Sequence, residues 1–165
     1  MSDGATMKNA MSLHEWRQHL ELTIRRYFDG CNEADIEKMA GCFEPDATHY
    51  FPPGMYGGAW HGARAIAERW SGFVASKGSS WTIDRLICEP ESDQAVIEWT
   101  HVKALEGRVL RGDEWYLFDP RSGLISEIRA YYAAPQDATL EWSELDGFDY
   151  RGRGYAHSRD EASAR

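Results

Sequence analysis

Apolar residues recur every three or four positions in the first half of the chain and at every second position in much of the second half. Between residues 12 and 31, such a stripe predicts an amphipathic helix. Ser12 and Glu15 have the spacing of a capping box, in which each side chain bonds a free backbone N–H at the helix start. The apolar residues of this stripe are Leu13, Trp16, Leu20, Ile24, Tyr27 and Cys31.

A second, short helix is predicted after Asp35, whose side chain is a good N-terminal cap. We expect it to end before Pro45, because proline disfavours helical geometry in the residue that precedes it. Residues 47–51 look extended and end at a Pro-Pro-Gly sequence, and a third helix is predicted over 62–76. The apolar residues of the short helix are Ile36, Met39 and Phe43.

Beyond residue 78 the apolar period of two is typical of β-strands. Turn-forming sequences separate the four strand-like stretches. The predicted strands are 81–88, 95–105, 109–118 and 124–133. Helices followed by a meander of strands indicate an α+β fold with a mainly antiparallel sheet. Three N-terminal helices would cover one face of this sheet, and its twist would let it curl around them and leave a pocket. The opposite face of the strand at 95–105 is a mixed surface of the kind found at protein interfaces, so we expect a homodimer to form through it, with the 135–155 segment adding contacts. The residues of this face are Val96, Glu98, Thr100 and Val102.

The two ends of the chain differ from this central domain, which we place at 12–134. Residues 1–11 are polar and are expected to be a loose leader. The segment 135–165 is polar again but carries more large apolar side chains than a disordered tail would. We therefore predict a strap over 135–155, packed on the domain or on a partner subunit, and a loose end over 156–165. The large apolar residues are Trp142, Leu145, Phe148, Tyr150 and Tyr155.

Composition limits the possible partners. A net charge of -9 argues against nucleic acid, whose binding needs a clustered Lys/Arg surface. No apolar run approaches the ~20 residues that cross a bilayer, so no membrane partner is expected. Three cysteines without CxxC spacing favour neither disulfides nor zinc, and a cytoplasmic location is expected. The 13% aromatic content suits a ligand-lining wall as well as a core.

Four segments in order resemble the SnoaL-like, or nuclear transport factor 2-like, family. They are YFDGCNEAD at 27–35, FEPDA at 43–47, His61-Gly62 before a helix, and GLISEIRAY at 123–131. The resemblance implies a cone-shaped α+β barrel, a homodimer formed through the sheet, and cofactor-free proton transfer in the members that are enzymes. The family includes ketosteroid isomerases, polyketide cyclases, scytalone-type dehydratases, epoxide hydrolases and non-catalytic domains, so the fold does not settle the function.

The comparison with ketosteroid isomerases is partial. Tyr27 stands eight residues before Asp35, as the oxyanion-binding tyrosine of those enzymes does before the aspartate of the next turn. Their general base, an aspartate before a proline on the first strand, is replaced here by Phe51. Their third group, a protonated acid, falls on Glu114 if one residue of slack is allowed. Steroid isomerisation by the standard route is therefore not expected.

His49 is a candidate replacement for the missing base. It stands two residues before Phe51, so both side chains point to the same side of a strand. An imidazole with a pKa near neutrality is suited to take a proton from carbon or oxygen. The alternative is a hydrogen-bonded wall histidine without a chemical role.

A second histidine, His101, shares a strand face with Ile97 and Trp99 and is expected to be buried. A buried histidine needs a partner, and a carboxylate on the neighbouring strand would supply one. Glu114 is that partner if it faces inward with Leu110, Tyr116 and Phe118. The other strand phase puts Asp113 inward instead. The sequence leaves both phases open, and we favour Glu114.

These residues lead to one functional prediction and two alternatives. The prediction is a cofactor-independent lyase or isomerase for a small apolar aromatic, terpenoid or polyketide-like molecule. The alternatives are a non-catalytic ligand-binding or dimerisation module and an epoxide hydrolase, although no Asp-Arg-Asp cluster can be assembled. No tight metal motif such as H-E-x-x-H occurs, so no metal site is predicted. The predicted catalytic residues are His49, His101, Glu114, Tyr27 and Asp113. The predicted substrate-binding residues are Tyr50, Phe51, Trp60, His61, Trp99, Tyr116 and Tyr132.

Overall fold

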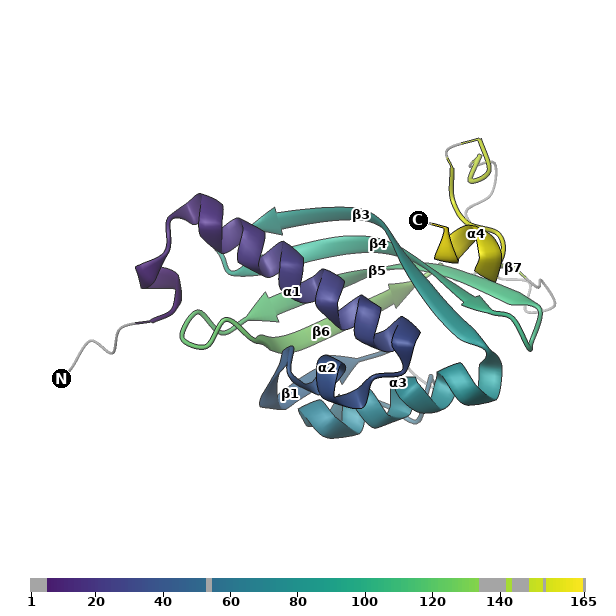
Figure 1. The fold of residues 1–165 in the computed structure, drawn as a ribbon, viewed down its shortest axis with the longest axis horizontal. Coiled ribbons are helices and arrows are strands. Elements are labelled where there is room, and N and C mark those ends of the chain that lie inside the picture. Colours follow the sequence, from purple (N-terminus) through teal and green to yellow (C-terminus); the bar gives the residue numbers. More distant parts are fainter. Residues whose placement is uncertain (1–5, 53–54, 134–141, 144–148, 153, 165) are drawn as a thin grey trace.

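A curved sheet is covered on one face by helices, as the computed structural model shows (Figure 1). The structure describes residues 6–52, 55–133, 142–143, 149–152 and 154–164. Its helices are a 3-10 turn η1 (Lys8–Ala10), α1 (Leu13–Glu33), α2 (Ile36–Ala40), α3 (Ala63–Lys77) and α4 (Arg159–Ser163). Its strands are β1 (Phe43–Tyr50), β2 (Trp60–His61), β3 (Ser79–Glu89), β4 (Gln94–Lys103), β5 (Arg108–Phe118), β6 (Ile125–Tyr132) and β7 (Trp142–Ser143).

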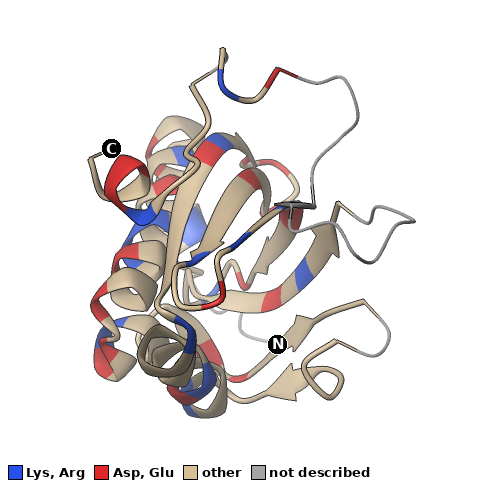
Figure 2. Cartoon of the chain, turned by 90° about the vertical axis from the view of Figure 1, so that its right-hand side faces the viewer, with Lys and Arg blue, Asp and Glu red and all other residues tan. Residues whose placement is uncertain are grey.

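The strand order is β2-β1-β6-β5-β4-β3, with β7 beside β5. Neighbouring strands are antiparallel except for β1 with β6 and β5 with β7. The helices α1, α2 and α3 lie on the inner, concave face (Figure 1). Seen from the side, acidic and basic residues are interspersed along these helices rather than gathered by sign (Figure 2). The predicted α+β class, with its curved and mainly antiparallel sheet, is confirmed.

The helix starts follow the predicted caps. Ser12 accepts from the backbone N–H of Glu15, and the Glu15 carboxylate accepts from the backbone N–H of Ser12, so the capping box is complete. Asp35 accepts from the backbone N–H of Lys38 at the start of α2. Because these orphan donors are satisfied locally, α1 and α2 can present their apolar stripes to the sheet.

The first strand differs from the prediction. Phe43 was expected on the short helix, but α2 ends at Ala40 and β1 already begins at Phe43. Pro45 then lies inside β1, where it lacks the N–H that a regular ladder needs. The β1–β6 register shifts between Phe43 and Thr48, so Pro45 falls in the irregular stretch. A proline that was expected to stop a helix is tolerated within an interrupted strand.

The N-terminal segment is tied to the domain from Met7 onward, rather than being loose up to residue 11. The backbone N–H groups of Met7 and Lys8 donate to the carbonyls of Arg121 and Pro120 at 3.1 and 3.0 Å. The Lys8 ammonium also lies 2.6 Å from a carboxylate oxygen of Asp93. These contacts hold the segment before α1 against two turns, the one between β5 and β6 and the one between β3 and β4.

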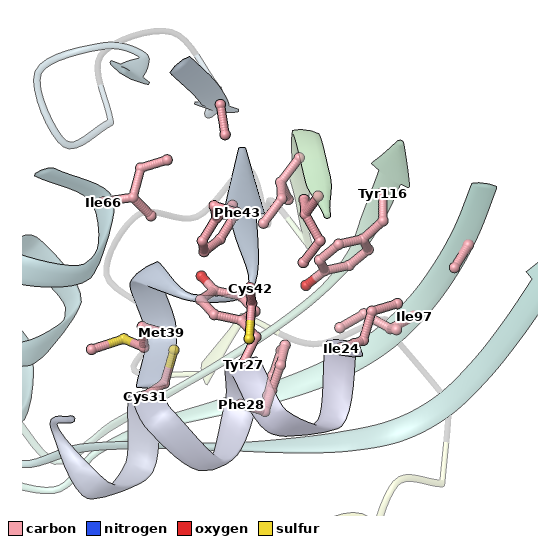
Figure 3. Close-up of a cluster of buried hydrophobic side chains, with 14 of the residues drawn as sticks. Ile24, Tyr27, Phe28, Cys31, Met39, Cys42, Phe43, Ile66, Ile97 and Tyr116 are labelled. Carbon is pink, nitrogen blue, oxygen red and sulfur yellow. The ribbon is translucent and has the colours of Figure 1, made fainter. Parts of the chain in front are cut away.

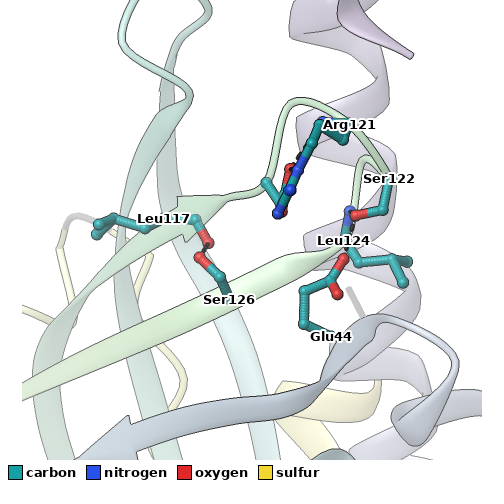
Figure 4. A network of polar contacts seen from close by, with 7 residues as sticks. Glu44, Leu117, Arg121, Ser122, Leu124 and Ser126 are labelled. Carbon is teal, nitrogen blue, oxygen red and sulfur yellow. Dashed lines mark hydrogen bonds and ion pairs between the residues drawn. The ribbon is translucent and has the colours of Figure 1, made fainter. Parts of the chain in front are cut away.

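The same turn is joined to β1 by side chains (Figure 4). The Ser122 hydroxyl donates to the Glu44 carboxylate on β1 and accepts from the backbone N–H of Leu124 at 3.1 Å. The Ser126 hydroxyl donates to the Leu117 carbonyl at 3.1 Å, next to the shift in the β5–β6 register. These bonds hold β1, β5 and β6 together at one end, and this positions the residues that β1 contributes to the inner face.

The described residues from Asp149 onward pack on the outer face of the sheet of the same chain. Tyr150 and Tyr155 are buried, and the Tyr155 hydroxyl bonds the Glu98 carboxylate. The Arg111 guanidinium lies 4.7 Å from the Tyr150 ring centre and 5.5 Å from that of Tyr155. Ala156 and Ala162 are buried as well, so the expected loose end is packed against the domain. Leu145, Phe148 and the side chain of Trp142 lie outside the described residues.

Candidate active site

Three strands bring a small polar cluster together on the inner face. His49 on β1 and Tyr116 on β5 both pair with Ile128 of the intervening β6. Glu114 is the next inward residue along β5, because side chains alternate between the two faces. The strand order and the alternation of side chains therefore place His49 beside Glu114 and Tyr116, although β1 and β5 are far apart in sequence.

The Glu114 carboxylate is the centre of this cluster. Its Oε1 lies 3.4 Å from Nε2 of His49, and its Oε2 accepts from the Tyr116 hydroxyl at 2.5 Å. The His49 contact has the distance of an ion pair, but its angles are not those of a hydrogen bond. Both ring nitrogens of His49 have no hydrogen-bond partner among the described residues. His49 is fully buried, whereas the Glu114 side chain keeps 8% of its accessible surface.

Tyr27 of α1 lies on the helix side of the interior, in the same group of buried side chains as Tyr116 (Figure 3). It is buried, and its ring meets Phe43 edge-on with centres 4.9 Å apart. Burial raises its pKa well above the ordinary value, with Cys31 and Glu114 adding to the shift. Burial likewise raises the pKa of Tyr116, with Glu114 and Tyr27 adding to it. Both phenols therefore remain protonated and can act as hydrogen-bond donors at neutral pH.

Aromatic side chains form a wall around His49. Its ring stacks on Phe51 with centres 4.2 Å apart and lies near Trp60 and Trp70 at 6.0 and 5.6 Å. Tyr56 packs on Phe51 with centres 5.0 Å apart. Tyr56 and Trp70 were not predicted as site residues. The glycine-rich loop around Tyr56 and the apolar stripe of the third helix were the signals available for them.

Trp99 and Tyr132 continue this wall further along the sheet, as expected. Their rings meet edge-on with centres 4.8 Å apart. Trp99 pairs with Gly112 of β5, and a Cβ atom on Gly112 would lie 2.5 Å from Cζ2 of the indole. The glycine therefore makes room for the indole, a role that the sequence reading missed.

His101 has a different partner from the one predicted. It lies opposite Leu110, whereas Glu114 lies opposite Ile97, so the expected His101–Glu114 pair does not form. Its Nε2 is instead 2.8 Å from the Ser79 hydroxyl, and its ring stacks on Trp81 with centres 4.4 Å apart. Burial lowers the pKa of His101 well below the usual value, and Lys103 and Lys77 lower it further. It is thus a neutral histidine held by a serine.

This lowered pKa predicts a pH-dependent stability. Above pH ~6.5 His101 is neutral in both states, but below it only the unfolded chain takes up the proton. The free energy of unfolding should therefore fall by up to about 1.4 kcal/mol per pH unit on this account as the pH drops below ~6.5. Urea unfolding at several pH values should show that the free energy of unfolding depends less steeply on pH in His101→Gln than in the unmodified protein. If His101→Gln has the same pH dependence as the unmodified protein and the exposed control His14→Gln, His101 is not the group responsible.

Three predicted site residues lie away from the inner face. Asp113 lies on the outer face with its side chain exposed, and partial desolvation of its carboxyl group, followed by the charge of Glu98, raises its pKa. Tyr50 is 44% exposed, because it has the opposite strand phase to His49. His61 is also exposed, with Nδ1 3.1 Å from the Thr48 hydroxyl. The phase that puts Glu114 inward necessarily turns Asp113 outward.

In the described part of the chain, no group of three or more His, Cys, Asp or Glu side chains is arranged to hold a metal ion. None of the helices in the same residues is long and apolar enough to span a bilayer. The three cysteines are free thiols.

A curved, mainly antiparallel sheet covered on one face by three N-terminal helices is the nuclear transport factor 2-like class of fold. The SnoaL-like domain family matches residues 24–152, and the chain belongs to this family. The resemblance inferred from the sequence is confirmed.

Solved structures place the chain among similar folds. A protein of unknown function with a cystatin-like fold from Methylobium petroleophilum PM1 is 56% identical, with 85% of this chain and 92% of that chain covered and a TM-score of 0.72. A putative ketosteroid isomerase from Kribbella flavida DSM 17836 is 16% identical over 75% and 84%, with a TM-score of 0.60. SalBIII, an epoxide hydrolase/cyclase-like enzyme of pyran ring formation in salinomycin, is 16% identical over 73% and 94%, with a TM-score of 0.59. No curated protein matches the chain.

Proposed function

We propose that this protein is a cofactor-independent isomerase or lyase that moves a proton on a small, largely apolar molecule bound between the helices and the sheet. The observation that carries the proposal is the buried His49–Glu114 pair, with Tyr116 bonded to the second carboxylate oxygen. An acid-base pair of this kind is costly to keep inside an aromatic interior, and chemistry is the usual reason for such a cost.

His49 is the general base in this proposal. A carboxylate facing Nε2 favours the tautomer with its proton on that nitrogen, which leaves the lone pair of Nδ1 free to accept a proton. Glu114 then stabilises the imidazolium that forms, as an orienting carboxylate does in a catalytic triad. Tyr116 is a positioning residue, because its hydroxyl holds Glu114 and does not need to touch the substrate.

Tyr27 is the donor to the substrate oxygen on which negative charge develops. Its raised pKa keeps the phenol protonated, and the residue belongs to the helix side of the interior that faces β5. A donor in a dry interior stabilises an oxyanion more strongly than it would in water. The proton thus leaves carbon or oxygen toward His49 while the charge on oxygen is met by Tyr27.

The aromatic wall favours an aromatic, terpenoid or polyketide-like substrate. Phe51, Trp60 and Trp70 surround the histidine and offer ring faces and edges rather than charges. Apolar walls with a few placed polar groups are typical of small-molecule sites. The two enzyme-like neighbours of the same fold, a putative ketosteroid isomerase and an epoxide hydrolase/cyclase-like enzyme, are consistent with this class of chemistry.

Two other functions remain as rivals. A non-catalytic binding module would use the same wall without turnover. An epoxide hydrolase would need an Asp-Arg-Asp cluster facing the substrate, but the buried Arg111 points to the outer face, where it bonds the Thr100 hydroxyl. The geometry therefore favours proton transfer over epoxide opening.

Proton exchange tests the proposal without knowledge of the natural substrate. 1-Tetralone, a bicyclic ketone with acidic α-protons, would be incubated with the protein in heavy water and followed by NMR. We expect exchange of the α-protons above the buffer rate. A rise in the melting temperature with this and related ketones, but no exchange of any of them, would favour the binding module.

We also propose a homodimer, as the family resemblance implies, but through a different part of the outer face from the one predicted. Thr100 and Val102 were expected at the interface, yet they are buried under the chain's own C-terminal segment. Trp115 and Tyr131 remain 41% and 53% exposed on the uncovered part. Light scattering at micromolar concentration should give the mass of a dimer, and Trp115→Glu should shift it toward the monomer. A monomeric mass for the unmodified protein would refute the proposal.

A further inference from the structure

The indole N–H of Trp99 is a buried hydrogen-bond donor without a partner in the described part of the chain. Trp99 is only 2% exposed, so bulk water does not satisfy the group. An indole N–H can only donate, unlike a histidine ring, which can change its tautomer to suit its neighbours. Buried donors are almost always paired, and an exception calls for an explanation.

The edge of this indole that carries the N–H lies close to Gly112 of β5, two residues before Glu114 of the proposed catalytic cluster. Cζ2 of the indole sits over Gly112, and Nε1 is only two bonds away from Cζ2. Glu114 is the next inward residue along β5, which makes it the diagonal cross-strand neighbour of Trp99. Such neighbours are roughly 7–8 Å apart.

The indole is held in place rather than free to turn toward another acceptor. Tyr132 meets it edge-on, and Gly112 leaves a gap into which its six-membered ring fits. The neighbouring Glu114 side chain is not completely closed off, since it keeps 8% of its accessible surface. The donor is thus fixed beside the carboxylate of the proposed catalytic cluster.

We infer that Trp99 is a specificity-determining residue, whose N–H binds a second oxygen of the substrate. The inference rests on the proposed function, in that the substrate occupies the same inner face. One oxygen then belongs to the group that exchanges its proton at His49 and Tyr27. The other is an ether, hydroxyl or carbonyl oxygen at a different position of the molecule. The substrate class is accordingly a doubly oxygenated, largely apolar ring compound, not a hydrocarbon with a single ketone.

Two probes isolate the second oxygen. 6-Methoxy-1-tetralone carries an ether oxygen across the ring from its carbonyl group, and 1-tetralone lacks it. Calorimetric titration of the unmodified protein should show that the methoxy compound binds about 2- to 10-fold more tightly, the worth of one neutral hydrogen bond. Trp99→Phe should remove this preference while 1-tetralone binding changes less.

A second variant, which keeps the shape of the indole, tests the same point if phenylalanine disturbs the packing. Replacing the Trp99 indole with benzothiophene, by incorporation at an amber codon, removes the N–H but retains the ring outline, and it should also abolish the preference. Trp115→Phe, on the outer face, is the matched control and should keep it. The inference is overturned if the preference survives both Trp99 variants, if it is absent from the unmodified protein, or if neither probe binds up to about 1 mM.

The failure of the inference and that of the proposed function are separable. The preference is a property of binding and requires no turnover. His49→Gln tests the proton transfer by the exchange rate of 1-tetralone, which has no second oxygen. If the protein catalyses exchange but shows no preference for the methoxy compound, the proposed enzyme function stands and the role of Trp99 is refuted. If it shows the preference but catalyses no exchange, the role of Trp99 stands and the proposed enzyme function is refuted.

Discussion

Replacing His49 with glutamine is expected to slow the exchange of 1-tetralone α-protons by a factor of about 10² to 10⁴, the usual worth of a positioned general base. An amide has no basicity near neutral pH, so the variant keeps much of the bulk of the ring and loses only the proton acceptor. NMR in heavy water measures the effect directly. Glu114→Gln should also slow exchange, because the imidazolium then loses its facing negative charge.

His61→Gln is the matched control for this experiment. His61 is a histidine on the short strand beside β1, but it is exposed and bonded to Thr48 on the outside. Its replacement should leave the exchange rate unchanged. Equal exchange rates in His49→Gln and the unmodified protein, with circular dichroism showing both folded, would rule out His49 as the base.

The sequence predicted the inner face well wherever strand alternation decides it. His49 and Phe51 share a face in the structure, as expected from a period of two, and their rings stack. Glu114 faces inward with Tyr116, which was the favoured of two phases. Alternation says which side a residue faces, and for these residues that was sufficient.

Contacts between residues on distant strands could not be predicted from side-chain alternation. Glu114 was matched with His101 because β4 and β5 are neighbours in sequence, but its partner His49 comes from β1, on the far side of β6. Only the order β1-β6-β5 brings these two together, and that order includes a parallel pair of strands that no turn signal announces. A crossover of this kind is a property of the whole sheet.

The packing of the chain ends was likewise beyond local patterns. Residues 156–165 are polar, and that composition suggested a loose end. Ala156 and Ala162 nevertheless pack against Val102 and Val109 on the outer face. Two alanines give almost no hydrophobic signal in a sequence window, although small side chains allow close contact with a sheet.

Gly112 controls how the inner face is built, and we expect Gly112→Ala to lower the free energy of unfolding by about 2–4 kcal/mol. A Cβ atom there would lie 2.1 Å from the Tyr131 carbonyl oxygen and 2.5 Å from Cζ2 of Trp99. The first of these atoms belongs to the backbone of the paired strand β6, so relief requires the strands to move apart. Overpacking a rigid site typically costs about 1–3 kcal/mol and sometimes more.

The measurement is a melting curve, in which this loss should lower the midpoint by roughly 4–16 °C for a chain of this length. Gly72→Ala is the matched control, because Gly72 lies in α3 with nothing within 4 Å of the added methyl group. It should stabilise the protein by about 0.5–1 kcal/mol through the better helix propensity of alanine. If Gly112→Ala lowers the melting temperature and Gly72→Ala raises it, the loss of a glycine as such cannot explain the destabilisation. The cause would then be the close approach of Trp99 and β6 to Gly112. Equal stability of Gly112→Ala and the unmodified protein would mean that this contact is absent in solution.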